Sequence, residues 1–104
     1  MKNCVIYCTV PNEFNANLLA TTLVEEKLAA CVNIIPSITS VYKWEGIVQT
    51  DNELLLMIKT QESKFEDLKN KIIELHEYTV PEIIAVPIIL GNEEYQKWII
   101  KETE

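Results

Sequence analysis

The sequence predicts an α+β fold in one domain, with strands and helices in the order β-α-β-β-α-β and a short helix near the C-terminus. Three observations lead to this prediction. Apolar and polar residues alternate within a mostly apolar run at residues 3–10. Apolar residues recur at helical spacing in residues 13–27 and again in residues 62–76. Between these helical segments, the stretch Leu28–Thr60 is rich in β-branched and aromatic residues and contains a single Gly turn signal.

The first 27 residues are predicted to form a strand and a helix. The strand at residues 3–10 has apolar side chains on both faces, which is typical of a central strand. It ends at Pro11, and Asn12 is a suitable N-cap for a helix over Glu13–Lys27. A chain of 104 residues can build one hydrophobic core, so we expect a single domain over residues 1–104.

The stretch Leu28–Thr60 is predicted to form one long β-hairpin whose turn is Glu45-Gly46. Limbs of this length would reach roughly 40 Å at about 3.3 Å per residue, whereas an ordinary strand spans roughly 17–20 Å. The hairpin should therefore project beyond its own domain. Pro36 interrupts the first limb and predicts a bend or bulge there. Because the tip is apolar and aromatic, we expect another copy of the chain to cover it.

The second half of the chain completes the pattern. Thr60 is expected to cap an amphipathic helix that runs from about Glu62 to His76. Ile83–Leu90 is predicted to be the last core strand, and Pro87 places it at a sheet edge or beside a bulge. Residues 93–101 should form the short C-terminal helix. This is the ferredoxin-like plan, an antiparallel sheet with two helices on one face, and we expect the bare apolar face to be buried in a closed cyclic oligomer.

The composition excludes several classes of function. Sixteen acidic and nine basic residues give a net charge of −7, which disfavours binding to nucleic acid and to anionic membrane surfaces. The N-terminal apolar run is too short and too β-like for a signal peptide or a membrane-spanning helix, so we expect a cytoplasmic protein with three free thiols. The sequence has no Gly-rich phosphate loop, no H-E-x-x-H motif and no Arg, so we expect a non-enzymatic protein without an organic cofactor.

Two side chains could bind a metal ion. His76 is the only histidine and follows the second predicted helix, where it either contacts backbone carbonyls or acts as a metal ligand or proton-transfer group. Cys31 is either a buried small side chain or a thiolate ligand for a soft metal such as Cu(I). Polar and aromatic residues near the hairpin and the predicted helices could line a cleft between subunits that binds a small ligand. These residues are Tyr42, Trp44, Glu45, Lys59, Tyr78, Glu82 and Trp98.

Four motifs follow one another along the chain: LAACVNI at residues 28–34, YKWEG at 42–46, ELLLMIKT at 53–60 and HEYTVPEI at 76–83. With Gly91, Tyr95 and Trp98 near the end, they resemble the successive signatures of the CutA family, the divalent-cation tolerance proteins. The resemblance implies a ferredoxin-like protomer, similar to that of PII signalling proteins, assembled as a homotrimer through its hairpin and edge strands. It also implies a role in tolerance to copper and other divalent metals, with Cys31 and His76 at the positions of proposed metal-binding residues.

The chain departs from the usual family pattern in two places. Glu77 and Thr79 stand where the family usually has Pro after its His and an acidic residue after its Tyr. Pro36-Ser37 stands where the family usually has Pro-Gly. The first departure puts a carboxylate next to His76, where it either adds a metal ligand or alters the loop.

The leading hypothesis is a homotrimer that binds Cu(II) or another divalent ion at a subunit-interface cleft. The ligands would be His76, Glu82 or Glu77, and Cys31 if its thiol is accessible. A second hypothesis is a PII-like signalling module that holds a small ligand between subunits and reports it to a partner protein. A third is a structural assembly protein with no ligand.

Overall fold

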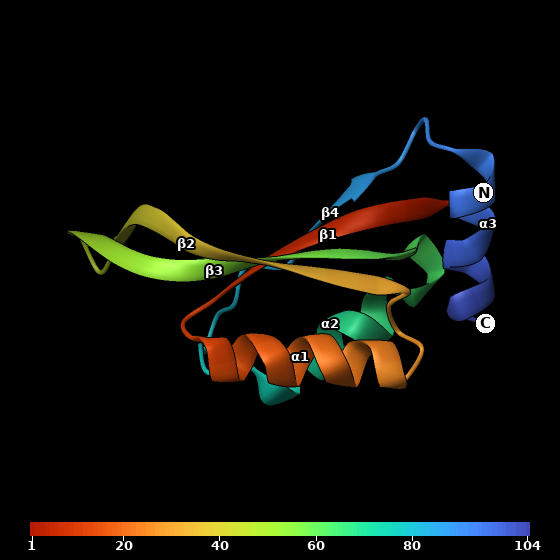
Figure 1. Cartoon of the computed structure of the whole chain (residues 1–104). Helices are drawn as coiled ribbons and strands as arrows, with labels where there is room; N and C mark the ends of the chain where they lie inside the picture. The colour runs from red at the N-terminus through yellow and green to blue at the C-terminus, as the bar shows by residue number, and fades with distance from the viewer.

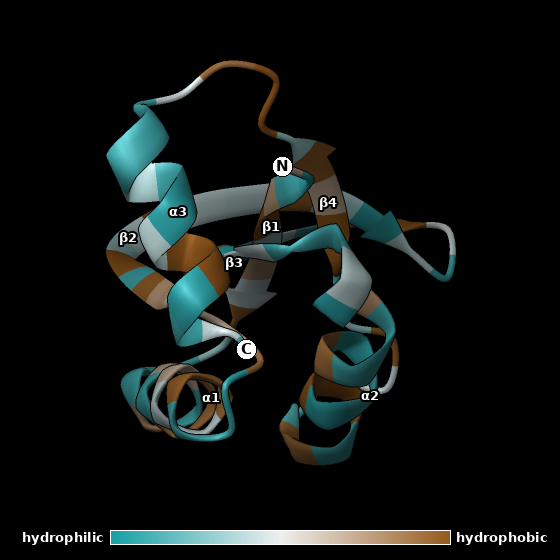
Figure 2. Cartoon of the chain, turned by 90° about the vertical axis from the view of Figure 1, so that its right-hand side faces the viewer, coloured by the Kyte–Doolittle hydropathy of each residue, from teal (hydrophilic) through white to brown (hydrophobic).

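The structure, a computed structural model, describes residues 1–104 and has the predicted order of elements (Figure 1). The four strands form one antiparallel sheet in the order β2-β3-β1-β4. Helices α1 and α2 lie side by side on one face of this sheet (Figures 1 and 2). The elements are β1 Asn3–Val10, α1 Glu13–Glu25, β2 Cys31–Trp44, β3 Ile47–Gln61, the 3-10 helix η1 Glu62–Lys64, α2 Phe65–Leu75, β4 Ile84–Pro87 and α3 Glu93–Glu102.

The hydrophobic core lies between the sheet and the two helices. The alternation predicted for residues 3–10 is confirmed, because every second residue of β1 from Cys4 to Val10 is almost fully buried. These side chains lie opposite alternate residues of β3, since β1 pairs with β3 along its whole length. The largest buried side chains of this core are Ile6, Leu19, Leu23, Leu56, Ile58, Leu68 and Ile72.

The helix ends are partly as predicted. Asn12 caps α1, and its Oδ1 accepts a hydrogen bond of 2.8 Å from the backbone N–H of Asn15. The prediction that Thr60 caps the second helix is wrong. Thr60 is a buried residue of β3 whose hydroxyl donates to the carbonyl of Leu28 at 2.6 Å, and η1 separates β3 from α2. The tertiary contact with Leu28 therefore takes the hydroxyl that a cap would need.

The predicted hairpin is confirmed and contains a bulge. Strand β2 pairs with β3 from Cys31 to Ile35 in one register, and from Ile38 to the hairpin turn in a register shifted by one residue. Pro36 and Ser37 lie in this irregularity, where Ser37 has a positive φ of 59°. Two residues of β2 thus occupy the space opposite one residue of β3, as in a β-bulge.

The hairpin turn and its projection also follow the prediction. Glu45 and Gly46 both have positive φ, 51° and 81°, as a tight two-residue hairpin turn of type I′ requires. The hairpin extends beyond the helices, and the molecule measures 44 × 25 × 22 Å along its principal axes (Figure 1).

Strand β4 lies at the sheet edge, as Pro87 predicted, but it is shorter than the predicted Ile83–Leu90. It pairs with β1 from Ile84 to Pro87, and the backbone N–H of Ile88 donates to the carbonyl of Asn3 at 3.0 Å. The chain then leaves the sheet, so Ile89 and Leu90, which suggested a longer strand, are exposed.

The face of the sheet away from α1 and α2 is called the open face. Its strand residues, among them Tyr7, Leu55 and Met57, are half-buried within one chain. The expectation of a wholly bare face needs one correction, because α3 covers the end where β1 begins and β3 ends. The side chain of Asn3 donates to the carbonyl of Gln96 at 3.1 Å, and α3 contacts both strands (Figures 1 and 2).

Candidate functional site

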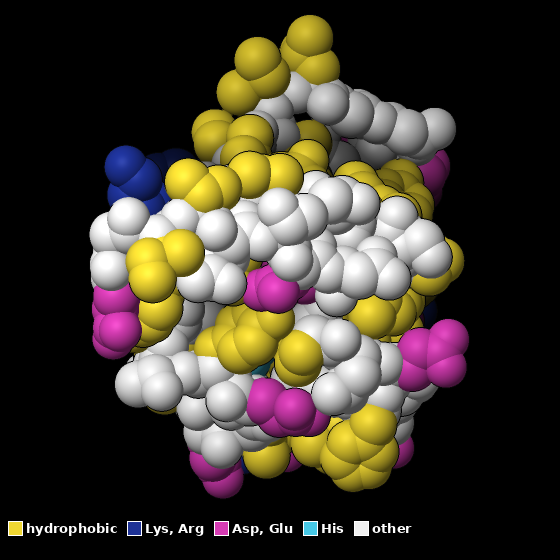
Figure 3. Space-filling model, turned by 90° about the vertical axis from the view of Figure 1, so that its left-hand side faces the viewer, with side chains coloured by type: hydrophobic (Ala, Val, Ile, Leu, Met, Phe, Trp, Pro, Cys, Tyr) yellow, Lys and Arg dark blue, Asp and Glu magenta, His cyan; other side chains and the backbone are white.

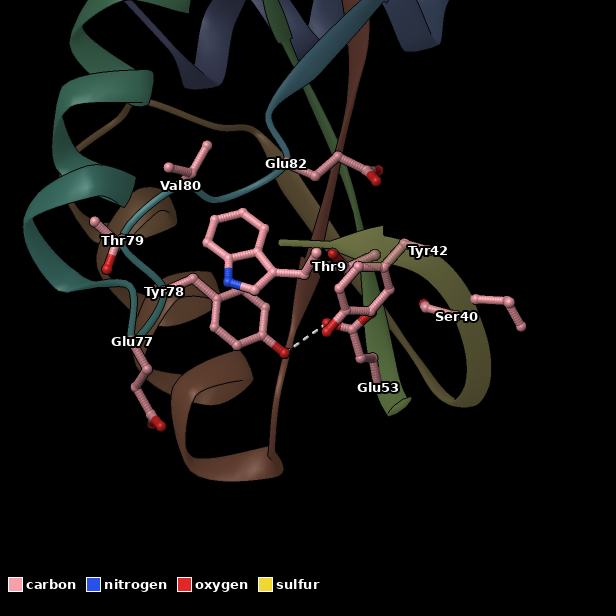
Figure 4. A pocket seen from close by; sticks show the side chains of 11 residues that line it. Thr9, Ser40, Tyr42, Glu53, Glu77, Tyr78, Thr79, Val80 and Glu82 are labelled. Carbon is pink, nitrogen blue, oxygen red and sulfur yellow. Dashed lines mark hydrogen bonds between the residues drawn. The ribbon is translucent and has the colours of Figure 1, made fainter. Parts of the chain in front are cut away.

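A cleft of about 700 Å³ lies between the hairpin and the segment that follows α2 (Figure 4). Strand β1 contributes to its wall through Thr9. Eleven residues line it: Thr9, Ser40, Val41, Tyr42, Trp44, Glu53, Glu77, Tyr78, Thr79, Val80 and Glu82.

The bulge in β2 determines which side chains of the hairpin line this cleft. Beyond the bulge, Ile38 lies opposite Glu53, and residues that lie directly opposite one another project to the same side of a ribbon. Alternate residues after Ile38 therefore project on the side of Glu53, and these include Tyr42 and Trp44. The hydroxyl of Tyr42 donates to the carboxylate of Asp51 on the same side.

Tyr78 joins the loop after α2 to the hairpin. Its hydroxyl donates to Glu53 Oε2 at 2.7 Å (Figure 4). Glu53 is only 5% exposed, although it carries a carboxylate. Burial and the hydrogen bond to Glu53 raise the pKa of Tyr78, so the phenol stays protonated and continues to donate.

The cleft is acidic and has no positive side chain in its lining. Glu53, Glu77 and Glu82 all contribute to its surface, and none of them takes part in an ion pair. Buried Cys8 lies within the field of two of these groups: burial, with the carboxylates of Glu82 and Glu53, raises the pKa of its thiol to about 12. Figure 3 shows acidic side chains among exposed hydrophobic ones on the side where the hairpin projects. A cation is therefore the ligand that this surface attracts.

His76 lies behind the cleft and is 9% exposed. Its Nε2 is 2.8 Å from the carbonyl oxygen of Thr9, and its Nδ1 accepts a hydrogen bond of 2.9 Å from the backbone N–H of Tyr78. A carbonyl can only accept and a backbone N–H can only donate, so the ring is the Nε2–H tautomer with both nitrogens occupied. His76 thus holds Tyr78 in place and has no free lone pair for a metal ion.

Glu77 is held by the start of α1. The side-chain amide of Asn12 lies 3.3 and 3.2 Å from the two carboxylate oxygens of Glu77. The backbone N–H of Glu77 donates to Asn15 Oδ1 at 3.4 Å, and Asn15 Nδ2 donates to the carbonyl of Leu75 at 3.1 Å. The carboxylate of Glu77 therefore connects the loop to α1.

The structure does not bring the three predicted metal ligands Cys31, His76 and Glu82 together within one chain. Cys31 lies opposite Lys59, whereas Thr9, the partner of His76, lies opposite Leu55. Lys59 and Leu55 are four residues apart along β3, a distance of about 13 Å. In addition, no group of three or more His, Cys, Asp or Glu side chains is placed to hold a metal ion. The sequence could not reveal this separation, because it depends on the pairing register.

The predicted cleft residues divide into two groups. Tyr42, Trp44, Tyr78 and Glu82 line the cleft as expected. The other three lie elsewhere: Glu45 is in the hairpin turn, Lys59 donates to Asn33 near the opposite end of the hairpin, and Trp98 of α3 stacks on Tyr95 with ring centroids 5.5 Å apart.

Sequence reasoning missed Glu53, which is the most buried acidic residue of the cleft. A signal for it was present. An acidic residue directly before the apolar run at residues 54–58 is placed at the start of a buried strand segment, where an ionisable group calls for a partner or a ligand.

The fold and the cleft define a class: small α+β proteins of the split β-α-β type, with an acidic cleft beside a hairpin that projects from the domain. Residues 4–102 match the model of a protein family described as CutA1 divalent ion tolerance protein, and the chain belongs to this family. None of its three helices has the length and apolar character needed to cross a membrane.

Relatives and solved structures agree with this assignment. The chain is 52% identical over 99 residues to the divalent-cation tolerance protein CutA of Thermus thermophilus, which covers 95% of this chain and 96% of that protein. It is 52% identical over 103 residues to the chloroplastic protein CutA of Arabidopsis thaliana, but spans only 57% of that longer protein. The structure of the Thermus thermophilus protein superimposes with a TM-score of 0.96 at 51% identity, covering 98% of this chain and 99% of that one. The CutA1 structure from Oryza sativa gives 0.97, also at 51%, with coverage of 100% and 95%.

Proposed function

We propose that this protein acts without catalysis in tolerance to divalent cations, and that it binds cations at the acidic cleft. The observation that carries the proposal is the set of carboxylates in the cleft that no positive side chain of the chain neutralises. Two of the relatives are named divalent-cation tolerance proteins, and these names support a role in cation tolerance.

Carboxylate oxygens are the ligands that we propose for the metal ion. Glu82 is exposed, lines the cleft and makes no hydrogen bond or ion pair in the chain, so its carboxylate can turn toward a bound ion. Glu77 also lines the cleft, but it would have to release Asn12 to do so. His76 does not fit the role, because both of its ring nitrogens are occupied. Since one chain presents no group of three such ligands, the coordination shell would be completed by water or by a second copy of the chain.

We propose further that the chain assembles as a homotrimer. The open face is apolar and half-exposed in one chain, and the outer edges of β2 and β4 carry no strand partner. Unpaired edges and apolar faces favour association, and identical chains usually close such contacts into a ring. The cleft lies beside the hairpin tip, so a neighbouring copy could supply the missing ligands.

The proposal is tested by calorimetric titration of the full chain with Cu(II) and Mn(II), with the oligomeric state measured by light scattering. Cys31→Ser serves as the background, because it removes the one thiol that is not buried and that Cu(II) could oxidise. Glu82→Gln should weaken binding at least tenfold, about 1.4 kcal/mol. Glu25→Gln, an exposed residue of α1 with no ion pair, is the matched charge control and should leave binding unchanged. No saturable binding, or equal affinity in Glu82→Gln, would overturn the proposed site.

A further inference from the structure

We propose that the cleft binds a small organic cation with an alkylammonium group, held between the aromatic side chains of Tyr42, Trp44 and Tyr78 and the carboxylate of Glu53. This ligand class goes beyond the binding of metal ions proposed above and does not depend on it. The two proposals share a surface but need different chemistry from it.

The aromatic side chains come from two elements and converge on one cavity. Tyr42 and Trp44 belong to β2, and Tyr78 belongs to the loop after α2. Figure 4 shows the rings of Tyr42 and Tyr78 in the same cavity. Both tyrosine hydroxyls donate to carboxylates, Tyr42 to Asp51 and Tyr78 to Glu53. These bonds fix the rings before a ligand arrives. A cation within about 6 Å of such rings is attracted by their π-systems.

Glu53 supplies a buried negative charge that the chain leaves uncompensated. The side chain is only 5% exposed, and the one hydrogen bond that it receives goes to Oε2 from Tyr78. Its other oxygen has no partner in the chain, and no Lys or His forms an ion pair with it. This oxygen is not fully buried, and Glu53 lines the cleft, so its charge attracts a cationic ligand that enters there.

The size and lining of the cleft also suit an organic cation. A volume of about 700 Å³ lies within the range of about 300–1,000 Å³ that small-molecule sites occupy. Five of the eleven lining residues are hydrophobic, and no three ligating side chains are grouped for a metal. An alkylammonium ion matches both parts of this surface, because its carbon groups contact the aromatic rings while its charge faces Glu53.

Choline is a suitable probe, and 3,3-dimethylbutan-1-ol is its neutral analogue of nearly the same shape. Calorimetric titration of the full chain should give saturable binding of choline and at least tenfold weaker binding of the alcohol. Glu53→Gln keeps the acceptor for Tyr78 and should weaken choline binding at least tenfold. Trp44→Leu should weaken it at least threefold through loss of the cation–π contact. Glu25→Gln is the control and should bind choline like the unmodified protein.

The result that overturns this inference is absence of saturable choline binding, equal binding of the alcohol, or unchanged affinity in Glu53→Gln. A parallel Mn(II) titration of the same samples separates the two proposals. Binding of Mn(II) without choline would leave the metal proposal standing and remove this one. Binding of choline alone would do the reverse, and competition between the two ligands would place them in one cleft.

Discussion

Replacement of His76 by Ala should destabilise the protein by about 2–4 kcal/mol without altering the carboxylates proposed as metal ligands. The side chain is 9% exposed and makes two hydrogen bonds, one to the carbonyl of Thr9 and one from the backbone N–H of Tyr78. Each such bond contributes about 1 kcal/mol net, and a polar group left unpaired away from water costs about 1–3 kcal/mol. Both backbone partners belong to half-buried residues, so water replaces the lost bonds only in part.

A second variant separates the two hydrogen bonds. In His76→Asn, the shorter side chain can still accept from the N–H two residues ahead, as Asn does in an Asx-turn, but it no longer reaches Thr9. We therefore expect His76→Asn to lose about half of the free energy that His76→Ala loses. Urea unfolding followed by tryptophan fluorescence, at one fixed protomer concentration, gives both values. A loss below about 0.5 kcal/mol in His76→Ala, the range of ordinary surface changes, would refute the structural role of His76.

Two further outcomes follow from the titrating groups. Because the pKa of Tyr78 in the folded chain lies above its ordinary value of 10.0, its contribution to stability is complete below pH 10 and declines as the pH rises beyond 10. Tyr78→Phe should remove that part of the alkaline decline, and an unchanged pH profile of urea midpoints would contradict this reasoning. Cys4 and Cys8 are buried with thiol pKa values raised by burial, so a thiol reagent at pH 8 should modify at most one cysteine per native chain, Cys31. Mass spectrometry counts the modified sites, and more than one per chain would show that the core opens.

The sequence was sufficient to predict the order of the elements, since this depends on local periodicity. Alternation in β1, the cap at Asn12 and the Glu45-Gly46 turn each have a signal within a few residues, and the structure contains all three. The predictions were wrong where a side chain bonds to a residue distant in sequence instead of to its neighbours. Thr60 has the chemistry of a cap, but its hydroxyl bonds to Leu28, and that preference cannot be read from neighbouring residues.

The candidate site was predictable only in part for the same reason. Aromatic and acidic residue types near the hairpin suggested a cleft, and Tyr42, Trp44, Tyr78 and Glu82 line one. Their arrangement depends on the pairing register, which also places Lys59 far from them. His76 is unavailable as a metal ligand partly because its ring bonds to the carbonyl of Thr9, 67 residues earlier in the chain. Sequence spacing carries no information about that bond.

The bulge at Pro36 and Ser37 determines on which side of the hairpin each side chain beyond it projects. If β2 continued without it in the register of Cys31–Ile35, Ile38 would lie opposite Asn52, and the side chains beyond it would exchange sides. Tyr42 and Trp44 would then project toward the helix side of the ribbon, while Lys43 would project on the side of Glu53.

In a straight strand of the same length, the cleft would thus contain the ammonium group of Lys43 and would lose the aromatic side chains of Tyr42 and Trp44. Deleting Ser37 while the bulge closes would, in contrast, leave every pair beyond Ile38 unchanged. The acidic and aromatic character of the cleft therefore depends on the pairing register of β2 as much as on residue type. It should be lost if the strand straightens at its present length and kept if the strand straightens by deletion of Ser37.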